Sequence, residues 1–128
     1  MNNDLDCNVE LPGDNIYENN DTRCGIMYAL EIVGQKWKIP IMWFLCENDS
    51  TRYNELKRRI KGITNMMLTK SLKELEEKNL VVRTQYETIP PKVEYSLTKR
   101  GKALLPVLRE LNAWGEEQIK IIDNIKKE

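Results

Sequence analysis

Five side chains between residues 65 and 73 have the types and spacing expected of a surface that reads base edges. They are Asn65, Met66, Thr69, Lys70 and Lys73, which would share one face of a helix. Asn can bind adenine through two hydrogen bonds, Thr can offer its hydroxyl or methyl to a base, and Lys can bind guanine or a phosphate. The same pattern also suits a solvated helix flank, so the spacing alone leaves both interpretations open.

Basic side chains lie on both sides of this set in the sequence. A nearly continuous basic group precedes it at residues 57–61, and two further cations lie in the segment that follows. Cations at such places bind backbone phosphates, which fixes the register of a protein on DNA without reading the bases. The residues expected to do so are Lys57, Arg58, Lys61, Arg83 and Lys92.

The net charge of zero conceals an uneven distribution of charge. Residues 51–102 contain 13 Lys and Arg against 6 Asp and Glu, whereas the rest of the chain contains 7 against 14. A basic middle of +7 is therefore balanced by −7 elsewhere. Clustered positive charge is typical of a surface that binds phosphates.

The residue types exclude most catalytic chemistry. The chain has no histidine and three cysteines without C-x-x-C spacing, so Ser-His pairs, Cys-His pairs and His-containing metal sites are excluded. Glu74, Glu76 and Glu77 lie in a Lys-rich helical segment, where we expect surface pairs four residues apart. We predict no enzyme activity, no metal and no cofactor.

Cys24 is a candidate redox sensor. It directly precedes a predicted helix and follows Arg23, and both neighbours favour a thiolate. The alternative is a buried packing cysteine. Cys7 could pair with Cys24 of either subunit, and Cys46, in the most apolar helix, is expected to be inert.

The first 22 residues differ in composition from the remainder. They are polar and acidic and contain Pro12-Gly13, which predicts a loosely attached arm followed by one domain over residues 23–128. An acidic start is the opposite of a signal peptide, and no apolar run is long enough to cross a bilayer. We therefore expect a cytoplasmic protein without membrane contact.

Apolar periodicity predicts four helices before residue 80. The first runs from residue 24 to Gly34, with Ile26 and Leu30 on its apolar face, and the second spans residues 37–46 and is apolar nearly all round. Asn54 is expected to cap the third. Thr64 is expected to cap the fourth, which buries a stripe of leucines, Leu68, Leu72 and Leu75.

The periodicity then changes to alternation. Residues 81–86 and 92–97 are predicted strands, joined by a stiff loop that contains Pro90-Pro91. Thr98 should cap a final helix, with a kink or late start at Pro106. Two helices joined by a short turn and followed by a hairpin predict a mostly helical α+β fold, a winged helix-turn-helix domain with a two-stranded wing and flanking helices.

The chain resembles the HxlR-type regulators, a branch of the MarR-like winged-helix transcription factors, from Cys24 to about Gly115. The matching motifs are Ala29–Trp37, Tyr53–Leu56, Gly62–Thr64, Leu72–Glu76, Leu80–Arg83, Trp114-Gly115 and, as the most specific, Pro90–Thr98. Met66 departs from the family, which often has a basic or polar residue there.

The resemblance implies a homodimer joined by the first and last helices, which binds a pseudo-palindromic operator on double-stranded DNA, most often as a repressor. It also implies a sensing thiol at Cys24. Two alternatives stay open. One is a winged-helix module that binds proteins and not DNA, and the other is a small-molecule effector site near the dimer interface, suggested by Trp37, Trp43 and Trp114.

Overall fold

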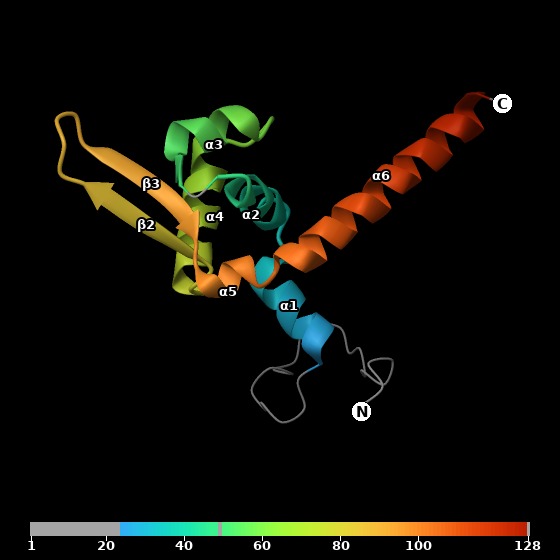
Figure 1. The fold of residues 1–128 in the computed structure, drawn as a ribbon, viewed down its shortest axis with the longest axis horizontal. Coiled ribbons are helices and arrows are strands. Elements are labelled where there is room, and N and C mark those ends of the chain that lie inside the picture. Colours follow the sequence, from blue (N-terminus) through green and yellow to red (C-terminus); the bar gives the residue numbers. More distant parts are fainter. Residues whose placement is uncertain (1–23, 49, 128) are drawn as a thin grey trace.

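The computed structural model describes residues 24–48 and 50–127. Its helices lie at one end of a small sheet whose two long strands form a projecting wing, and the last helix extends away on the opposite side (Figure 1). The predicted arm of residues 1–22, with Cys7, lies outside the described residues. Within the described part, no helix is both long and apolar enough to span a membrane.

The first two helices have nearly the predicted bounds. α1 spans Gly25–Val33 and ends at Gly34, and α2 spans Lys38–Cys46 with Pro40 in its first turn, where the missing N–H costs no hydrogen bond. α2 lies in the middle of the molecule (Figure 1), and Ile41, Met42 and Leu45 are almost completely buried. The prediction of a central buried helix is confirmed.

The next two helices form the helix-turn-helix pair. α3 spans Tyr53–Arg59 and α4 spans Asn65–Glu77. The Met67 N–H donates to Thr64 Oγ1 at 3.1 Å, which confirms Thr64 as the cap of α4. The prediction of Asn54 as the cap of α3 is wrong, because that helix begins one residue earlier and Arg52 holds the cap position without a side-chain bond.

The sheet contains one strand more than the sequence predicted. β2 spans Val81–Tyr86 and β3 spans Lys92–Leu97, both with the predicted bounds. The additional strand, β1, spans only Thr51–Arg52 and pairs antiparallel with β3 on the side away from β2. β1 directly precedes α3, so the wing is hydrogen-bonded to the start of the helix pair.

The predicted final helix is divided in two. α5 spans Lys99–Lys102 and is capped by Thr98, whose Oγ1 accepts from the Gly101 N–H at 3.0 Å, and α6 spans Leu105–Lys127. Pro106 occupies the second position of α6, where it is tolerated. The late start expected at Pro106 is therefore confirmed, although the chain before it forms a separate short helix.

One apolar core joins α2, α3, α4 and the base of the wing. The predicted stripe of Leu68, Leu72 and Leu75 is at most 1% exposed. Leu56 and Ile60 pack on it from α3, and Leu108 is the one residue of α6 in the core. These contacts fix the helix-turn-helix pair.

The apolar residues of α1 are divided between the core and the surface. Ile26 and Leu30 are 59% and 52% exposed, whereas Ile32 and Val33 enter the core. Periodicity predicts such an apolar face but does not indicate whether it packs within the chain or remains on its surface.

A buried ion pair connects α2 to α4. The Lys38 ammonium lies 2.9 Å from the Glu74 carboxylate, and the two side chains are 5% and 28% exposed. The hydrogen bond from Lys38 lowers the pKa of Glu74 below its ordinary value of 4.5, although burial opposes this. The expectation that Glu74 forms a surface pair within its own helix is wrong, because its partner comes from α2.

We expect Glu74→Gln to lower the free energy of unfolding by about 2 kcal/mol, because it leaves a buried ammonium without its counter-charge. Lys38→Met should lower the free energy of unfolding by less than about 1 kcal/mol, since the Glu74 carboxylate that it leaves unpaired can reach water. The folded-state pKa of Glu74 is depressed, so its contribution is complete above pH 4.5 and is lost as the pH falls through that lowered pKa. Urea unfolding at several pH values measures this.

Glu76→Gln is the matched control, because Glu76 is exposed on the same helix and in no described ion pair. All variants are compared at one protein concentration. An effect of Glu74→Gln no larger than that of Glu76→Gln, or one independent of pH between 7 and about 3, would show that the pair does not stabilise the fold.

Candidate nucleic-acid interface

The side chains predicted to read bases lie together on the outer face of α4. Asn65, Thr69, Lys70 and Lys73 are exposed, and Met66 is 77% exposed. The leucines of α4 face the opposite way, into the core. Ser71, the residue after Lys70, is 3% exposed and belongs to the buried side.

Tyr53 holds two of these side chains from the neighbouring helix. Its hydroxyl lies 3.0 Å from Thr69 Oγ1, 3.3 Å from Asn65 Oδ1 and 3.1 Å from the Asn65 carbonyl oxygen. A phenol has one proton, so it can donate to Asn65 while it accepts from the Thr69 hydroxyl. Tyr53 therefore restricts the rotamers of Asn65 and Thr69 before any ligand binds.

The basic residues of α3 are engaged to different degrees. Arg58 pairs with Glu55 within the helix, and Arg59 lies 2.8 Å from Glu47 and 3.5 Å from Glu55. None of the ion pairs among the described residues includes Lys57 or Lys61. Lys57 and Lys61 can therefore bind a phosphate without first breaking one of these ion pairs.

The two predicted cations of the wing also differ. Arg83 is exposed, and its only side-chain bond within the described part is a 3.4 Å contact to Gln85 Oε1. The Lys92 ammonium lies 3.8 Å from Glu94 and 4.6 Å from the centre of the Tyr86 ring. Arg83 is the more available of the two for a phosphate.

A groove of about 550 Å³ separates the wing from the start of α3. Arg52, Tyr53 and Asn54 line one side, and the wing tip from Thr88 to Val93 lines the other. The Thr88 hydroxyl donates to the Pro90 carbonyl oxygen at 2.7 Å across the tip, and Ile89 is fully exposed there. The groove lies beside the reading face, because Tyr53 contributes to both.

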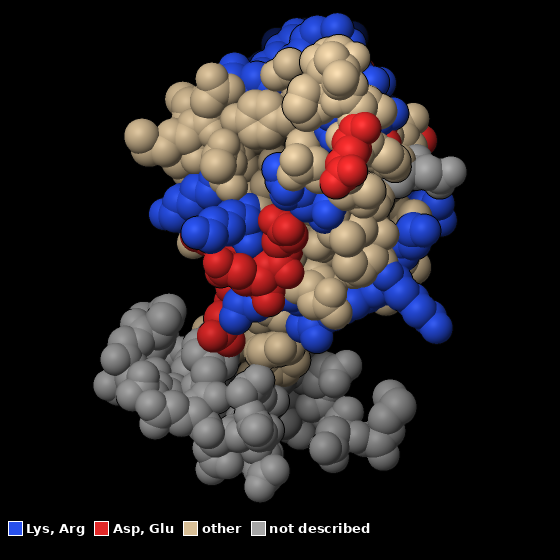
Figure 2. Space-filling model, turned by 90° about the vertical axis from the view of Figure 1, so that its left-hand side faces the viewer, with Lys and Arg blue, Asp and Glu red and all other residues tan. Residues whose placement is uncertain are grey.

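Charge is unevenly distributed over the side of the molecule that carries the wing. Figure 2 shows Lys and Arg side chains along the upper edge and on both flanks of this side, with the acidic side chains gathered mainly in one group below the centre. On this face the cations therefore lie in separate groups and not in one continuous strip.

The two cysteines within the described part are in different chemical states. Cys24 caps α1 in an extended conformation, is half-buried and is disulfide-bonded. Cys46 is a free thiol that donates to the Met42 carbonyl oxygen at 3.1 Å, and burial raises its pKa. A raised pKa means less thiolate, in keeping with the prediction that Cys46 is unreactive.

The three tryptophans occupy separate environments. Trp37 packs on the core beneath the Lys36 ammonium, and Trp43 lines an apolar hollow of about 250 Å³ between α2 and α6. Trp114 is 64% exposed on α6. They give no support for one shared aromatic pocket.

The sequence interpretation missed Lys38, Glu74 and Tyr53 as residues that position the interface. Their contacts cross from one helix to another, and periodicity within one helix carries no information about such contacts. A lysine at the start of an otherwise apolar helix was the one indication in the sequence that a carboxylate lay nearby.

Comparisons with known proteins agree with this geometry. The model of the HxlR-like helix-turn-helix family matches residues 32–123. An uncharacterised HTH-type transcriptional regulator of Halalkalibacterium halodurans is 50% identical over 88 residues, which is 69% of this chain and 78% of that protein.

Two solved structures of regulators are also similar. The redox regulator HypR in its oxidised form is 39% identical with a TM-score of 0.70, covering 73% of this chain and 96% of that one. Diamide-treated YodB from Bacillus subtilis is 34% identical with a TM-score of 0.62, and the match covers 74% of this chain and 94% of that one. This chain therefore belongs to the HxlR-like helix-turn-helix family and is a DNA-binding transcriptional regulator with a winged helix-turn-helix fold.

Proposed function

We propose that α4 is the recognition helix and reads bases in the major groove through Asn65, Met66, Thr69, Lys70 and Lys73. The observation that carries this is the exposed face of α4, which Tyr53 orders from α3. Neither Lys70 nor Lys73 takes part in an ion pair among the described residues. Two unpaired cations beside an ordered Asn and Thr suit base edges flanked by phosphates.

The phosphate contacts come from the flanking elements. Lys57 and Lys61 extend from the helix pair and Arg83 from the wing, whereas Arg58 and Lys92 must exchange an intramolecular carboxylate for a phosphate. That exchange lowers the net contribution of Arg58 and Lys92 to the free energy of DNA binding. Lys57, Lys61 and Arg83 should therefore contribute more to the salt dependence of binding.

Residues 23–128 act as one DNA-binding and dimerisation domain in this proposal. Along α6 one face follows alternating steps of three and four residues, through Leu108, Leu111, Gly115, Gln118, Ile122 and Ile125. Leu108 packs on its own core, whereas Ile122 and Ile125 are 48% and 61% exposed. A second copy would cover these residues together with Ile26 and Leu30 of α1.

A dimer of this kind presents two copies of α4. Two-fold symmetry requires a pseudo-palindromic operator, with half-sites about 34–36 Å apart, one turn of DNA. Binding across such a site is the activity that we assign to the chain.

Cys24 is the proposed site of a thiol response. It caps α1, the helix whose exposed apolar residues would meet the second copy. The related structures HypR and YodB include an oxidised and a diamide-treated form. Oxidation at Cys24 would join two thiols with loss of two protons and two electrons to the oxidant, and would act next to the dimer contact.

Lys70→Ala and Lys73→Ala should each weaken binding to a specific site by about 5- to 150-fold, corresponding to about 1–3 kcal/mol per lost base or phosphate contact. Binding is measured by gel shift and footprinting on the DNA upstream of the protein's own and adjacent genes, across a salt series. The footprint should contain two half-sites about one turn apart.

Lys120→Ala is the matched control, since Lys120 is an exposed lysine on α6 outside the helix pair. It should bind like the unmodified protein. An equal loss of affinity in Lys70→Ala, Lys73→Ala and Lys120→Ala would mean that the total positive charge, and not α4, governs binding. No preference for any upstream sequence even at low salt would favour a module that binds proteins instead.

Tyr53→Phe should reduce affinity for the specific site about fivefold, roughly 1 kcal/mol, because it frees Asn65 and Thr69 to adopt other rotamers. The ring and its packing remain, so the melting temperature should change little. Affinity for unrelated DNA and the salt slope should also be unchanged, because no phosphate contact is lost. An equal loss on unrelated DNA would contradict a role in ordering the reading face.

Because Cys24 is disulfide-bonded in the structure, dithiothreitol should change the operator affinity of the unmodified protein by reducing that bond, and diamide should restore the first affinity by forming it again. Cys24→Ser should abolish this response, and Cys46→Ser, the control, should retain it, since burial raises the pKa of Cys46. Gel shift measures affinity and peptide mass mapping identifies the bonded cysteines. A response that survives in Cys24→Ser would exclude Cys24 as the sensor.

A further inference from the structure

One large apolar side chain lies on the outer face of α4, among the polar ones. Met66 is 77% exposed, whereas the leucines of the same helix are buried and the neighbouring Met67 packs against the core. Most of the other exposed apolar side chains in the described part of the chain lie on α1 and α6, where a second copy would cover them. Met66 lies outside that surface, on the helix that we assign to DNA.

The outer face of α4 carries two rows of side chains. Asn65 and Thr69 are four residues apart and form one row, which the Tyr53 hydroxyl contacts. The second row follows at steps of four and three residues and consists of Met66, Lys70 and Lys73. The first row is polar and ordered, and the second presents one apolar group followed by two cations.

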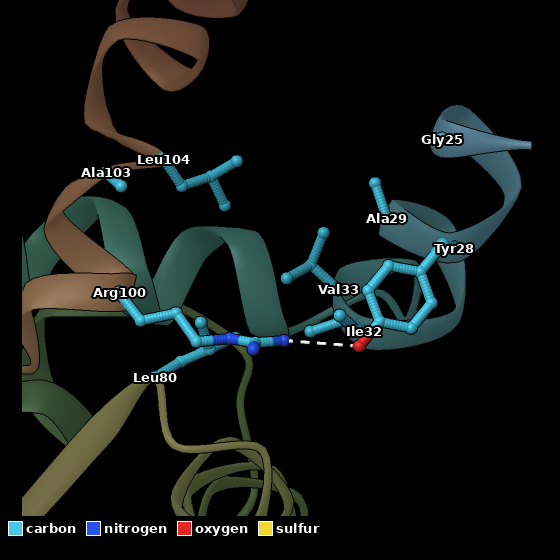
Figure 3. A pocket seen from close by; sticks show the side chains of 9 residues that line it. All are labelled: Gly25, Tyr28, Ala29, Ile32, Val33, Leu80, Arg100, Ala103 and Leu104. Carbon is cyan, nitrogen blue, oxygen red and sulfur yellow. Dashed lines mark hydrogen bonds between the residues drawn. The ribbon is translucent and has the colours of Figure 1, made fainter. Parts of the chain in front are cut away.

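Met66 lies in the first turn of α4, and the other end of this helix is enclosed. Leu80, three residues after α4 ends, is buried and lines a hollow with Ile32 and Val33 of α1 (Figure 3). The Leu80 carbonyl oxygen also accepts from the Thr98 N–H at 3.0 Å, directly before α5. The start of α4 is therefore the part that can enter a groove, and the first residues of a recognition helix are those that contact base edges.

The major groove of DNA offers one kind of apolar group. Every base pair presents hydrogen-bonding atoms there, and thymine alone adds an apolar group, its C5-methyl. A thioether side chain laid on an amino or carbonyl edge would remove that edge from water without replacing its hydrogen bond, which costs free energy. Contact with the methyl has no such cost and removes apolar surface from water on both sides.

We propose that Met66 reads one thymine in each half-site of the operator through the C5-methyl group of that base. This inference rests on the proposed function, in which α4 is the recognition helix. Met has three rotatable side-chain bonds and a polarizable sulfur, so it can pack on the methyl without a fixed rotamer. From Met66 to Lys70 the helix rises about 6 Å, close to two base-pair steps of about 3.4 Å. The group that Lys70 contacts therefore lies about two base pairs from the thymine.

The same contact extends to a modified base. 5-Methylcytosine carries its methyl group at the place in the major groove where thymine has one, whereas unmodified cytosine has no methyl there. Met66 therefore distinguishes methylated from unmethylated cytosine at this position of the half-site, with tighter binding to the methylated base.

Uracil tests this contact, because it differs from thymine only in lacking the methyl group. Each thymine of the footprinted operator is replaced by uracil at the same position in both half-sites of a synthetic duplex, and affinity is measured by gel shift. One position should lose about fourfold in affinity for each half-site, or about 15-fold for both, as expected for one buried methyl group. At that position, a duplex with 5-methylcytosine should bind more tightly than one with cytosine by a similar factor.

Met66→Gln keeps the length of the side chain but removes its apolar character, so this variant should bind the thymine and uracil duplexes equally. Met66→Leu should keep most of the preference for thymine. Val107→Gln is the matched control, because Val107 is an exposed apolar residue of α6 outside the helix pair. It should keep the full preference, and melting curves establish that each variant is folded.

Three results would overturn this role of Met66 and leave α4 as the recognition helix. They are a specific footprint in which no thymine methyl affects affinity, a preference for thymine over uracil that survives in Met66→Gln, and an equal loss of that preference in Val107→Gln. Failure to find any specific footprint would instead refute the proposed function, and the role of Met66 with it.

Discussion

The buried ammonium of Lys38 needs a counter-charge, and this need fixes the rotation of α4. A charge removed from water is tolerated only when it is paired, and here the partner, 2.9 Å away, is Glu74. The leucine stripe defines which side of α4 faces the core but allows some rotation about the helix axis. An ion pair is more directional, and because it lies one residue beyond Lys73, it adds to the leucine contacts a second restraint on where the exposed face of α4 points.

The other contacts of the helix pair depend on that orientation. Tyr53 reaches Asn65 and Thr69 only if α4 presents them toward α3. At the opposite end, Asn79 leaves the helix with a positive φ of 61°, a conformation that Asn tolerates better than most residues. Its carbonyl is then held by Thr98 at 2.7 Å. The reading face, the wing and α5 are thus connected through the two ends of one helix.

Local patterns predicted this architecture well, and contacts between elements escaped them. The alternation of apolar and polar residues predicted both strands of the wing, and the spacing of the leucines predicted α4, because each pattern reflects burial within one element. β1 is only two residues long, too short for any period to be visible. Tyr53 and Lys38 contact residues on other helices, and no pattern within one helix predicts the angle at which two helices cross. The sequence could not distinguish whether Ile26 and Leu30 are exposed or buried, because a partner surface and a core face have the same periodicity.

The exposed apolar residues explain why regulation would act near α1 and not at the DNA. α6 has 23 residues, about 34 Å of helix at 1.5 Å per residue, and only Leu108 enters the core. A helix with so little packing is marginal in water, so its far half needs another surface. If that surface is a second copy, the distance between the two α4 helices depends on how α1 and α6 pack. Cys24 directly precedes α1, so a change in its bonding would act on this packing and, through it, on the fit of the two α4 helices to the DNA.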